Sequence, residues 1–282
     1  MADMFNLDDC GGNISALDPG AGTGILSVAF IERIMSVASC ISVSLTCYEI
    51  DPEVLPILKS NLEYVKSEYP DQIEYRILEE DYILSQSNDF DENLLATKNP
   101  LKYDYVIANP PYLRVVRDHP AAMSMSKVVH GAPNLYFLFA AMSLFNLKPD
   151  AEMVYIIPRS WTSGAYFKAF RKYLLTNGKI EQIHLFTSRN KVFSSEEVLQ
   201  ETMIIKLRKT VRKLETVRIT SSNDSSDFDS ITILNAPYES VVSGNDMYVY
   251  LPINQDEINI IRKINTYNST LVDEGLKMKT GI

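Results

Sequence analysis

The sequence has few residues of the kinds that build metal sites or disulfide frameworks. Its 282 residues include only 3 cysteines and 3 histidines. The cysteines, Cys10, Cys40 and Cys47, are odd in number and lack the paired spacing of a zinc site, so we predict reduced thiols and no bound metal. No run reaches the roughly 18 uncharged apolar residues of a membrane helix, and the N-terminus has neither a basic start nor an apolar stretch. We therefore expect a cytoplasmic protein that is neither secreted nor inserted in a membrane.

Positive charge is also in short supply, with 27 Lys and Arg against 36 Asp and Glu and a net charge of −9. That balance argues against a nucleic-acid partner, because affinity for a polyphosphate depends largely on Lys and Arg. The distribution changes this interpretation, since residues 159–218 hold 13 basic and 5 acidic residues, a local balance of +8. This basic segment (159–218) indicates either a DNA-facing surface or the solvated faces of ordinary helices and strands.

The sequence does contain enough apolar residues, 46% of 282, to fill a substantial core. From residue 14 to residue 207, short β-rich runs alternate with helical patterns, which is typical of a doubly wound α/β sheet. The short connection before the last run favours an antiparallel last strand. We predict a mixed sheet of seven strands, at residues 14–17, 43–48, 73–78, 105–108, 153–157, 180–186 and 202–207.

Two stretches lack this rhythm. Residues 113–133 show no clear periodicity, so we expect a mobile loop in which His119 and His130 are ordinary surface residues. Residues 221–230 are polar and low in complexity, as in a hairpin tip or linker. For Trp161, the single tryptophan, core packing and DNA contact both stay open.

The first candidate site is a glycine-rich turn, DPGAGTG, which begins at Asp18 between the first predicted strand and the next helix. Gly20, Gly22 and Gly24 allow positive φ angles and close approach of a ligand, and the helix N-terminus presents free N–H groups. The GxGxG spacing differs from the dinucleotide and NTP motifs, so a pyrophosphate is not favoured. The turn predicts a site for a small ligand, although a purely structural turn stays open.

Carboxylates follow the next two predicted strands. Glu49, after the second strand, can accept hydrogen bonds from both hydroxyls of a ribose, whereas Asp51 and the proline after it are typical of a helix start. After the third strand, Asp81 can accept a hydrogen bond from an exocyclic adenine amine, with Tyr82 beside the ring. Acidic residues at such positions are also common helix caps, so both assignments depend on the neighbouring glycine turn.

The fourth predicted strand ends in Asn109, Pro110, Pro111 and Tyr112. Two prolines fix the backbone and remove two N–H donors, which leaves a rigid turn with carbonyl acceptors beside an amide and an aromatic ring. An exocyclic amine is a poor nucleophile because its lone pair is delocalised. If the Asn109 side-chain oxygen and the Pro110 carbonyl each accept one N–H, the lone pair can turn toward a methyl sulfonium, while Tyr112 stacks on the base. The turn therefore predicts methylation of an amine.

Together these motifs resemble the adenine-N6-specific DNA methyltransferases of restriction-modification systems, in the gamma group, whose glycine motif precedes NPPY. DPGAGTG is similar to their cofactor motif, EIDP to their ribose motif, EDY to their adenine-contacting motif and NPPY to their catalytic motif. The resemblance implies a Rossmann-like fold and double-stranded DNA with an extruded adenine, held by Tyr112 and Phe193. It also implies S-adenosylmethionine as the cofactor, bound by Asp18, Gly20, Gly22, Gly24, Glu49, Ile50, Asp81, Tyr82 and Asn109.

The resemblance covers roughly residues 14–210. The short stretch before the first strand leaves no room for the segment that covers the methionine part of the cofactor in this family, and residues 271–282 resemble the opening of a target-recognition region. We therefore expect a truncated chain, with an S-adenosylmethionine-binding catalytic domain at 1–210 and an extension that begins the recognition region at 211–282. The missing recognition domain or a restriction subunit is an expected partner.

Two other functions stay open. NPPY chemistry also suits RNA bases or a protein glutamine, although the residues after Tyr112 show no resemblance to release-factor methyltransferases. The chain could instead be a non-catalytic subunit that binds DNA or a partner protein. A lack of affinity for S-adenosylhomocysteine would favour that second alternative.

Overall fold

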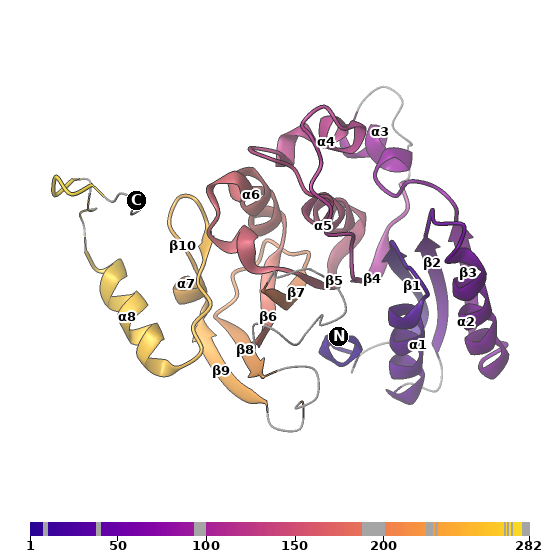
Figure 1. Cartoon of the computed structure of the whole chain (residues 1–282). Coiled ribbons are helices and arrows are strands. Elements are labelled where there is room, and N and C mark those ends of the chain that lie inside the picture. The colour runs from indigo at the N-terminus through magenta and orange to yellow at the C-terminus, as the bar shows by residue number, and fades with distance from the viewer. Residues whose placement is uncertain are drawn as a thin grey trace.

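The computed structural model contains a mixed sheet whose nine strands run in the order β3-β2-β1-β4-β5-β7-β6-β8-β9 (Figure 1). It describes residues 1–7, 11–37, 41–92, 100–187, 201–223, 228, 231–267, 269, 271 and 273–277. The strands are β1 (Gly12–Pro19), β2 (Ile41–Tyr48), β3 (Ile73–Leu78), β4 (Tyr103–Ala108), β5 (Leu147–Pro158), β6 (Lys179–Phe186), β7 (Thr202–Arg208), β8 (Thr216–Ser222) and β9 (Thr232–Pro237). A separate short ribbon pairs β10 (Val242–Ser243) with β11 (Tyr248–Val249).

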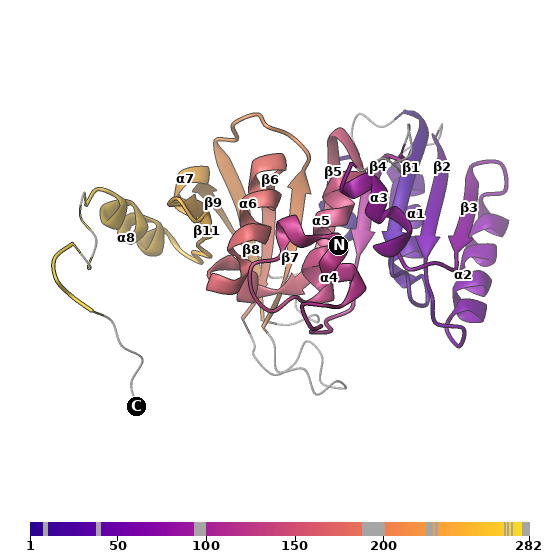
Figure 2. The same ribbon diagram turned by 90° about the horizontal axis from the view of Figure 1, so that it is seen from above.

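Helices cover both faces of the sheet, which buries two apolar clusters. Along β5, the side chains of Met153, Tyr155 and Ile157 enter the cluster that contains α5 and α6, whereas Val154 and Ile156 enter the cluster that contains α1 and α2. Figure 2 shows α2 and α8 at opposite ends of the molecule. The helices are α1 (Ile25–Val37), α2 (Leu55–Glu68), α3 (Ser87–Phe90), α4 (Pro120–Ser124), α5 (Leu135–Asn146), α6 (Lys168–Asn177), α7 (Tyr238–Val241) and α8 (Gln255–Asn265).

The predicted α/β architecture is confirmed, and each of the seven predicted strands lies within one of β1 to β7. Strands β1 to β5 form a parallel part of the sheet, in which each neighbouring pair runs in the same direction. The predicted antiparallel strand is β7, which runs antiparallel to both β5 and β6 and lies between them. Because β1 to β4 are parallel, the segments that follow them meet at one edge of the sheet.

The predicted number of strands was wrong, since β8 and β9 extend the sheet beyond β6. Their sequences, TVRITSS and TILNAP, are rich in polar residues, and β9 is largely exposed. Val217 and Ile219 on β8 are buried, whereas Ile233 on β9 is 57% exposed. The sheet thus continues to Pro237, so the predicted domain boundary at residue 210 falls inside it. A recognition region within 211–282 stays a prediction.

Residues 113–133 differ from the irregular loop that we expected. They contain α4 and a short 3-10 helix at Ser126–Val128, and Ala121 and Met125 are buried. The two ends are joined, because the Leu135 amide donates to the carbonyl of Leu113. Trp161, whose role was left open, is fully buried against Phe170 and belongs to the core.

Within the described part of the chain, no helix combines the length and the apolar character needed to cross a membrane.

Candidate active site

A cavity of about 450 Å³ lies where the carboxyl ends of β1, β2, β3 and β4 meet. The sheet order changes direction between β1 and β4, which is where open α/β sheets bind their ligands. The lining includes seven of the predicted site residues, Gly20, Glu49, Ile50, Asp81, Tyr82, Asn109 and Pro111. Asp18, Gly22, Gly24, Pro110 and Tyr112 lie nearby in the sequence but are not part of this lining.

The glycine turn has the backbone conformation that its sequence predicts. Gly20 and Gly22 have φ angles of 70° and 55°, in the left-handed region that other residues rarely adopt. A Cβ atom at Gly20 would lie 3.3 Å from the Phe139 ring, which is a tight contact. Glycine therefore avoids crowding at the cavity wall. The Gly22 amide donates to Oε2 of Glu49 at 2.8 Å, which ties the turn to the end of β2.

Glu49 organises the end of β2 as well as lining the cavity. Its Oε1 accepts hydrogen bonds from the amides of Ile50 at 2.8 Å and Asp51 at 2.9 Å. Each carboxylate oxygen has two lone pairs, so Oε1 is fully engaged, whereas Oε2, which accepts from Gly22, keeps one lone pair for a ligand. Asp51 instead accepts from the amide of Glu53 at 2.9 Å, in the turn that precedes α2, which agrees with a structural part for this residue.

Asp18 is almost fully enclosed, with 1% of its surface exposed. Its Oδ2 accepts a hydrogen bond from the Ser27 hydroxyl at 2.7 Å, while Oδ1 is buried without a partner. Burial raises the pKa of this carboxyl to about 7; hydrogen bonds from Ser27 oppose the rise, and the negative charge of Glu49 adds to it. The first residue of the motif therefore lies beneath the glycine turn as a carboxyl that binds a proton near neutral pH.

Asp81 and Tyr82 form the wall that follows β3. Oδ1 of Asp81 accepts from the amides of Ile83 at 2.9 Å and Leu84 at 2.8 Å, which fixes the carboxylate at the cavity. Tyr82 is buried, and its hydroxyl lies 2.9 Å from that of Ser143 in the interior. Its ring packs 5.2 Å from that of Phe139. Tyr82 thus lines the cavity while its hydroxyl is engaged in the interior.

The NPPY turn places an amide and an aromatic ring at the rim. The Tyr112 hydroxyl donates to Oδ1 of Asn109 at 2.7 Å and also lies 3.0 Å from the carbonyl oxygen of Ile156 on β5. Asn109 is exposed and Pro110 is buried, so the amide reaches outward from a fixed backbone. Oδ1 of Asn109 therefore accepts one hydrogen bond from Tyr112, and its role as an acceptor for an amine stays a prediction.

Six residues of the cavity wall were not among the predicted site residues, namely Tyr48, Glu80, Ile83, His119, Leu135 and Phe139. His119, expected at the surface, lines the cavity, and its Nδ1 accepts from the amide of Ala121 at the start of α4. Phe139, one helical turn beyond Leu135 on α5, also lines the cavity. The helical spacing of the NLYFLF run could have indicated Phe139, whereas the position of His119 depends on how α4 packs. The predicted base contact Phe193 lies outside the described residues.

Comparisons with known proteins show the family to which the chain belongs. A family model described as Eco57I restriction-modification methylase matches residues 27–193. The chain belongs to this family. Among curated relatives of this methylase, the type II methyltransferase M.PstI of Providencia stuartii is 32% identical over all of the chain and 55% of its own length. M.BsuBI of Bacillus subtilis is 34% identical with the same coverage, so the chain spans about half the length of the curated relatives it matches.

Solved structures agree with the fold assignment. A class I S-adenosylmethionine-dependent methyltransferase from Listeria monocytogenes superposes with a TM-score of 0.58 at 18% identity, over 78% of the methylase chain and 62% of its own. A type I restriction-modification methyltransferase subunit from Streptococcus thermophilus gives 0.56 at 17% identity, over 93% and 49%. These likenesses confirm the predicted Rossmann-like methyltransferase fold, which is in line with S-adenosylmethionine as the cofactor.

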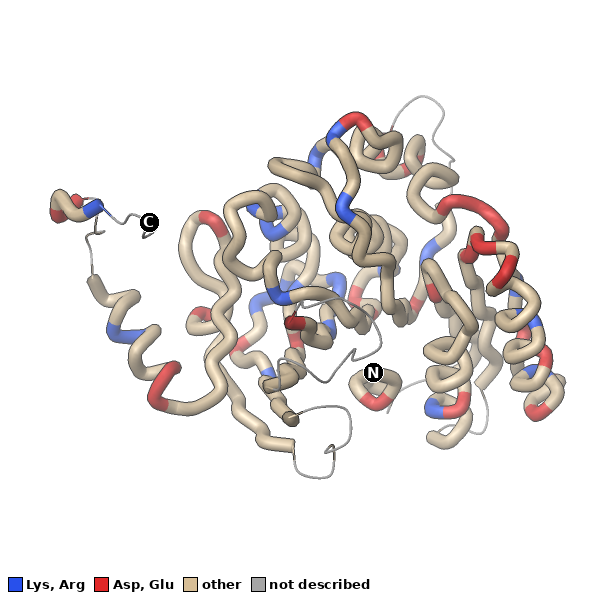
Figure 3. Tube along the Cα trace, in the orientation of Figure 1, with Lys and Arg blue, Asp and Glu red and all other residues tan. Residues whose placement is uncertain are grey.

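Among the described residues of the basic segment (159–218) of the methylase, several cations are engaged by other groups of the protein rather than gathered on one exposed surface. Arg171 is fully buried and donates to the carbonyl oxygens of Trp161 and Gly164. Lys209 donates to the carbonyls of Phe145 and Leu147. Figure 3 shows the basic positions dispersed over the central strands and α6. Much of the local excess of positive charge is therefore engaged inside the protein.

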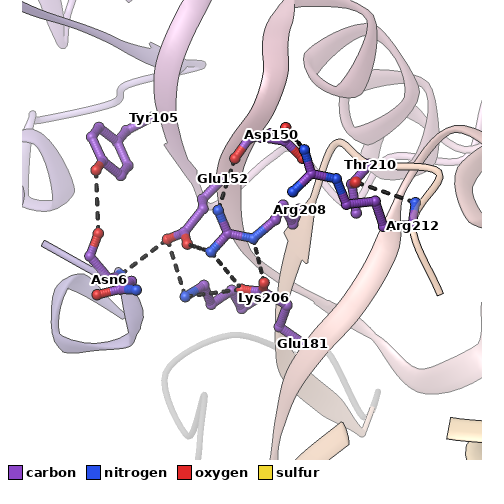
Figure 4. Close-up of polar contacts among 9 residues, drawn as sticks. All are labelled: Asn6, Tyr105, Asp150, Glu152, Glu181, Lys206, Arg208, Thr210 and Arg212. Carbon is purple, nitrogen blue, oxygen red and sulfur yellow. Dashed lines mark hydrogen bonds and ion pairs between the residues drawn. The ribbon is translucent and has the colours of Figure 1, made fainter. Parts of the chain in front are cut away.

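Two further cations of this segment belong to a buried ion network between β5, β6 and β7 (Figure 4). Lys206 lies 3.0 Å from Glu152 and 3.1 Å from Glu181, and Arg208 pairs with the same two carboxylates. The amide of Asn6 donates to Glu152 at 3.0 Å, so the N-terminal residues are tied to the network. The two positive and two negative charges balance, which explains how they can be buried.

Proposed function

We propose that this methylase transfers a methyl group from S-adenosylmethionine to the exocyclic N6 amine of adenine in double-stranded DNA, as the modification activity of a restriction-modification system. The observation that supports this most directly is the cavity that joins Gly20, Glu49, Asp81 and Asn109. An enzyme of this kind needs a nucleoside pocket and an amine acceptor side by side, and the four strand ends bring both to one place.

The cavity residues fit the proposed cofactor. Glu49 would accept a hydrogen bond from the ribose, Asp81 one from the adenine amine, and Ile50 and Phe139 would hold the ring between them. Phe139 lies so close to Gly20 that a side chain at residue 20 would crowd the cavity, so glycine keeps this part of the cavity open. When bound, S-adenosylmethionine supplies a methyl group on a positively charged sulfur.

The NPPY turn would handle the target adenine. Oδ1 of Asn109 accepts one N6 hydrogen and the carbonyl of Pro110 the other, so the nitrogen becomes more tetrahedral and gains nucleophilicity. Tyr112 stacks on the extruded base, and Pro111 keeps the turn rigid between base and cofactor. Phe193 would cover the other face of the base. The proton on nitrogen becomes acidic only as the methyl group arrives, so no strong base is needed.

We assign the catalytic domain to residues 1–210 together with the strands that continue its sheet, and a target-recognition function to residues that follow them. Double-stranded DNA is the proposed substrate, and a recognition domain or a restriction subunit is the proposed protein partner. The relatives, which are nearly twice as long as this chain, support a further region of that kind.

The test is transfer of tritium from labelled S-adenosylmethionine to DNA, RNA and protein, with the protein made from the complete gene. We expect label in DNA, recovered as N6-methyladenine after digestion to nucleosides. Asn109→Ala removes the acceptor and should lower the single-turnover rate roughly 100-fold or more, while the affinity for S-adenosylhomocysteine should change little by comparison. Tyr112→Phe keeps the ring and should stay substantially active, which makes it the matched control. Label only in RNA or protein, or wild-type turnover by Asn109→Ala, would refute the proposal.

A further inference from the structure

A second cleft of about 520 Å³ lies at the carboxyl end of β5. Its lining comes from the last residue of β5, the 3-10 turn that follows, the residue before β7, and the extension after β11, namely Pro158, Arg159, Ser160, Ser163, Glu201 and Leu251. Since β4 and β5 are parallel, this cleft lies at the same edge of the sheet as Asn109. A DNA strand that reaches the NPPY turn would therefore approach the edge of the sheet that holds this cleft.

Two short chains of contacts connect this cleft to the proposed base-stacking residue. The rings of Tyr112 and Tyr136 lie 6.4 Å apart, and the hydroxyl of Tyr136 lies 3.3 Å from that of Ser160 in the cleft wall. The Tyr112 hydroxyl also contacts the carbonyl of Ile156, two residues before Pro158. A strand bound next to Tyr112 would pass this wall.

The cleft and the proposed cofactor cavity lie at the ends of different strands of the sheet. The cofactor cavity is built on the ends of β1 to β4 and has Asn109 in its wall, whereas the cleft is built on β5 and the start of β7, beyond β4 in the sheet order. A methyl acceptor must approach from the side opposite the departing sulfur. The strand that delivers the base is thus directed toward β5 and the cleft.

The polar groups of the cleft suit a phosphate. Arg159 supplies a guanidinium, and Ser160 and Ser163 supply hydroxyls, which are among the usual ligands of DNA phosphates. Arg159 pairs with Glu201 at 3.4 Å, and their side chains are 23% and 41% exposed. It also donates to the carbonyl of Phe186, which anchors one edge of the guanidinium. Glu201 occupies the position that an incoming anion would take.

We propose that this cleft binds a phosphate of the DNA strand that carries the extruded adenine, and that Arg159 exchanges Glu201 for that phosphate when DNA binds. The inference rests on the proposed function and deepens it. It assigns opposite signs to the two members of the ion pair, because Arg159 attracts the strand while Glu201 competes with it. A purely structural ion pair would give both residues the same sign.

The experiment measures binding of a fluorescent duplex of mixed sequence to the protein from the complete gene, with S-adenosylhomocysteine present and over a range of salt. Glu201→Gln should tighten binding about 3- to 10-fold. Arg159→Gln should weaken it and flatten the salt slope by about one unit. In the double variant, the gain from Glu201→Gln should vanish, since the cation that it releases is absent.

Matched controls lie at the far end of the molecule. Glu74→Gln removes a carboxylate that pairs with Lys66 on the β3 side, and Arg33→Gln removes an arginine that pairs with Asp3. Glu74→Gln should not tighten DNA binding as Glu201→Gln does, and Arg33→Gln should not weaken it as Arg159→Gln does. Tightening cannot arise from misfolding, so Glu201→Gln tests the idea even if Arg159→Gln is unstable.

Equal tightening by Glu201→Gln and Glu74→Gln, or none by either, would overturn the cleft assignment while the proposed function stands. Persistence of the gain without Arg159 would overturn it as well. If the wild-type protein neither binds nor methylates duplex DNA, both the proposed function and this inference fail. The methyl-transfer assay therefore separates the two.

Discussion

Replacing Asp18 by asparagine should change how the stability of the protein depends on pH. Asp18 is buried beneath the glycine turn, and burial, opposed by Ser27 and reinforced by Glu49, raises its pKa to about 7. In the unfolded chain an aspartate titrates near 3.9. Between these two values the folded protein keeps a proton that the unfolded chain has released, so folding becomes less favourable as the pH rises through this window.

The size of the effect follows from the difference between the two pKa values. Each pH unit well inside the window costs about 1.4 kcal/mol and the slope declines near the folded pKa, which gives about 2 kcal/mol between pH 5 and pH 7 and just under about 3 kcal/mol by pH 8. The asparagine side chain cannot ionise, so the Asp18→Asn variant lacks this penalty. Its amide also places a donor where Oδ1 now lies without a partner, and that cost is the same at every pH.

The assay is urea unfolding of the wild-type and Asp18→Asn proteins at several pH values from about 5 to about 8, without cofactor. The difference between their free energies of unfolding cancels the other titrating groups. We expect this difference to move in favour of Asp18→Asn by about 3 kcal/mol as the pH rises. A difference that stays constant over the range would show that Asp18 is ionised throughout and would refute the argument from burial.

Two other substitutions test the site and the ion network. Glu49→Ala removes an acceptor for the ribose and the hydrogen bond to the Gly22 amide. Binding of S-adenosylhomocysteine should therefore weaken by roughly 2 to 4 kcal/mol in calorimetry. An unchanged dissociation constant would exclude Glu49 from the site. Glu152→Ala leaves Lys206 and Arg208 with Glu181 as their shared carboxylate, so the free energy of unfolding in urea should fall by roughly 3 kcal/mol or more. A loss below about 1 kcal/mol would show that the network adds little stability.

The cavity could be predicted from the sequence because parallel strands end at a common edge. Once the four strands were recognised, Gly20, Glu49, Asp81 and Asn109 had to follow them and converge. His119 could not be found in this way, because its place depends on the packing of α4 against the rest of the wall. Residue type alone pointed to the surface.

The sheet extension and the basic residues show two further limits. Several buried positions of β8 and β9 are polar or small, such as Thr220, Ser222 and Ala236, so the apolar pattern is too weak to stand out from a polar linker. Counting charges suggested an exposed basic surface, but it does not show which cations are paired. Lys206 and Arg208 alternate along β7 and face the same side as Glu152, which lies directly opposite Arg208 in the register of β5 and β7. That pairing depends on the register of the sheet, which cannot be derived from the number of charged residues.

The position of β7 has a consequence for the order in which the sheet assembles. Ribosomes make β5 and β6 first, yet the two strands are not neighbours, because β7 must enter between them from a later part of the chain. Glu152 of β5 and Glu181 of β6 meet their cations only when β7 arrives with Lys206 and Arg208. Closure of the sheet and neutralisation of its interior are thus one event, so the half of the fold beyond β4 should form in a single cooperative step.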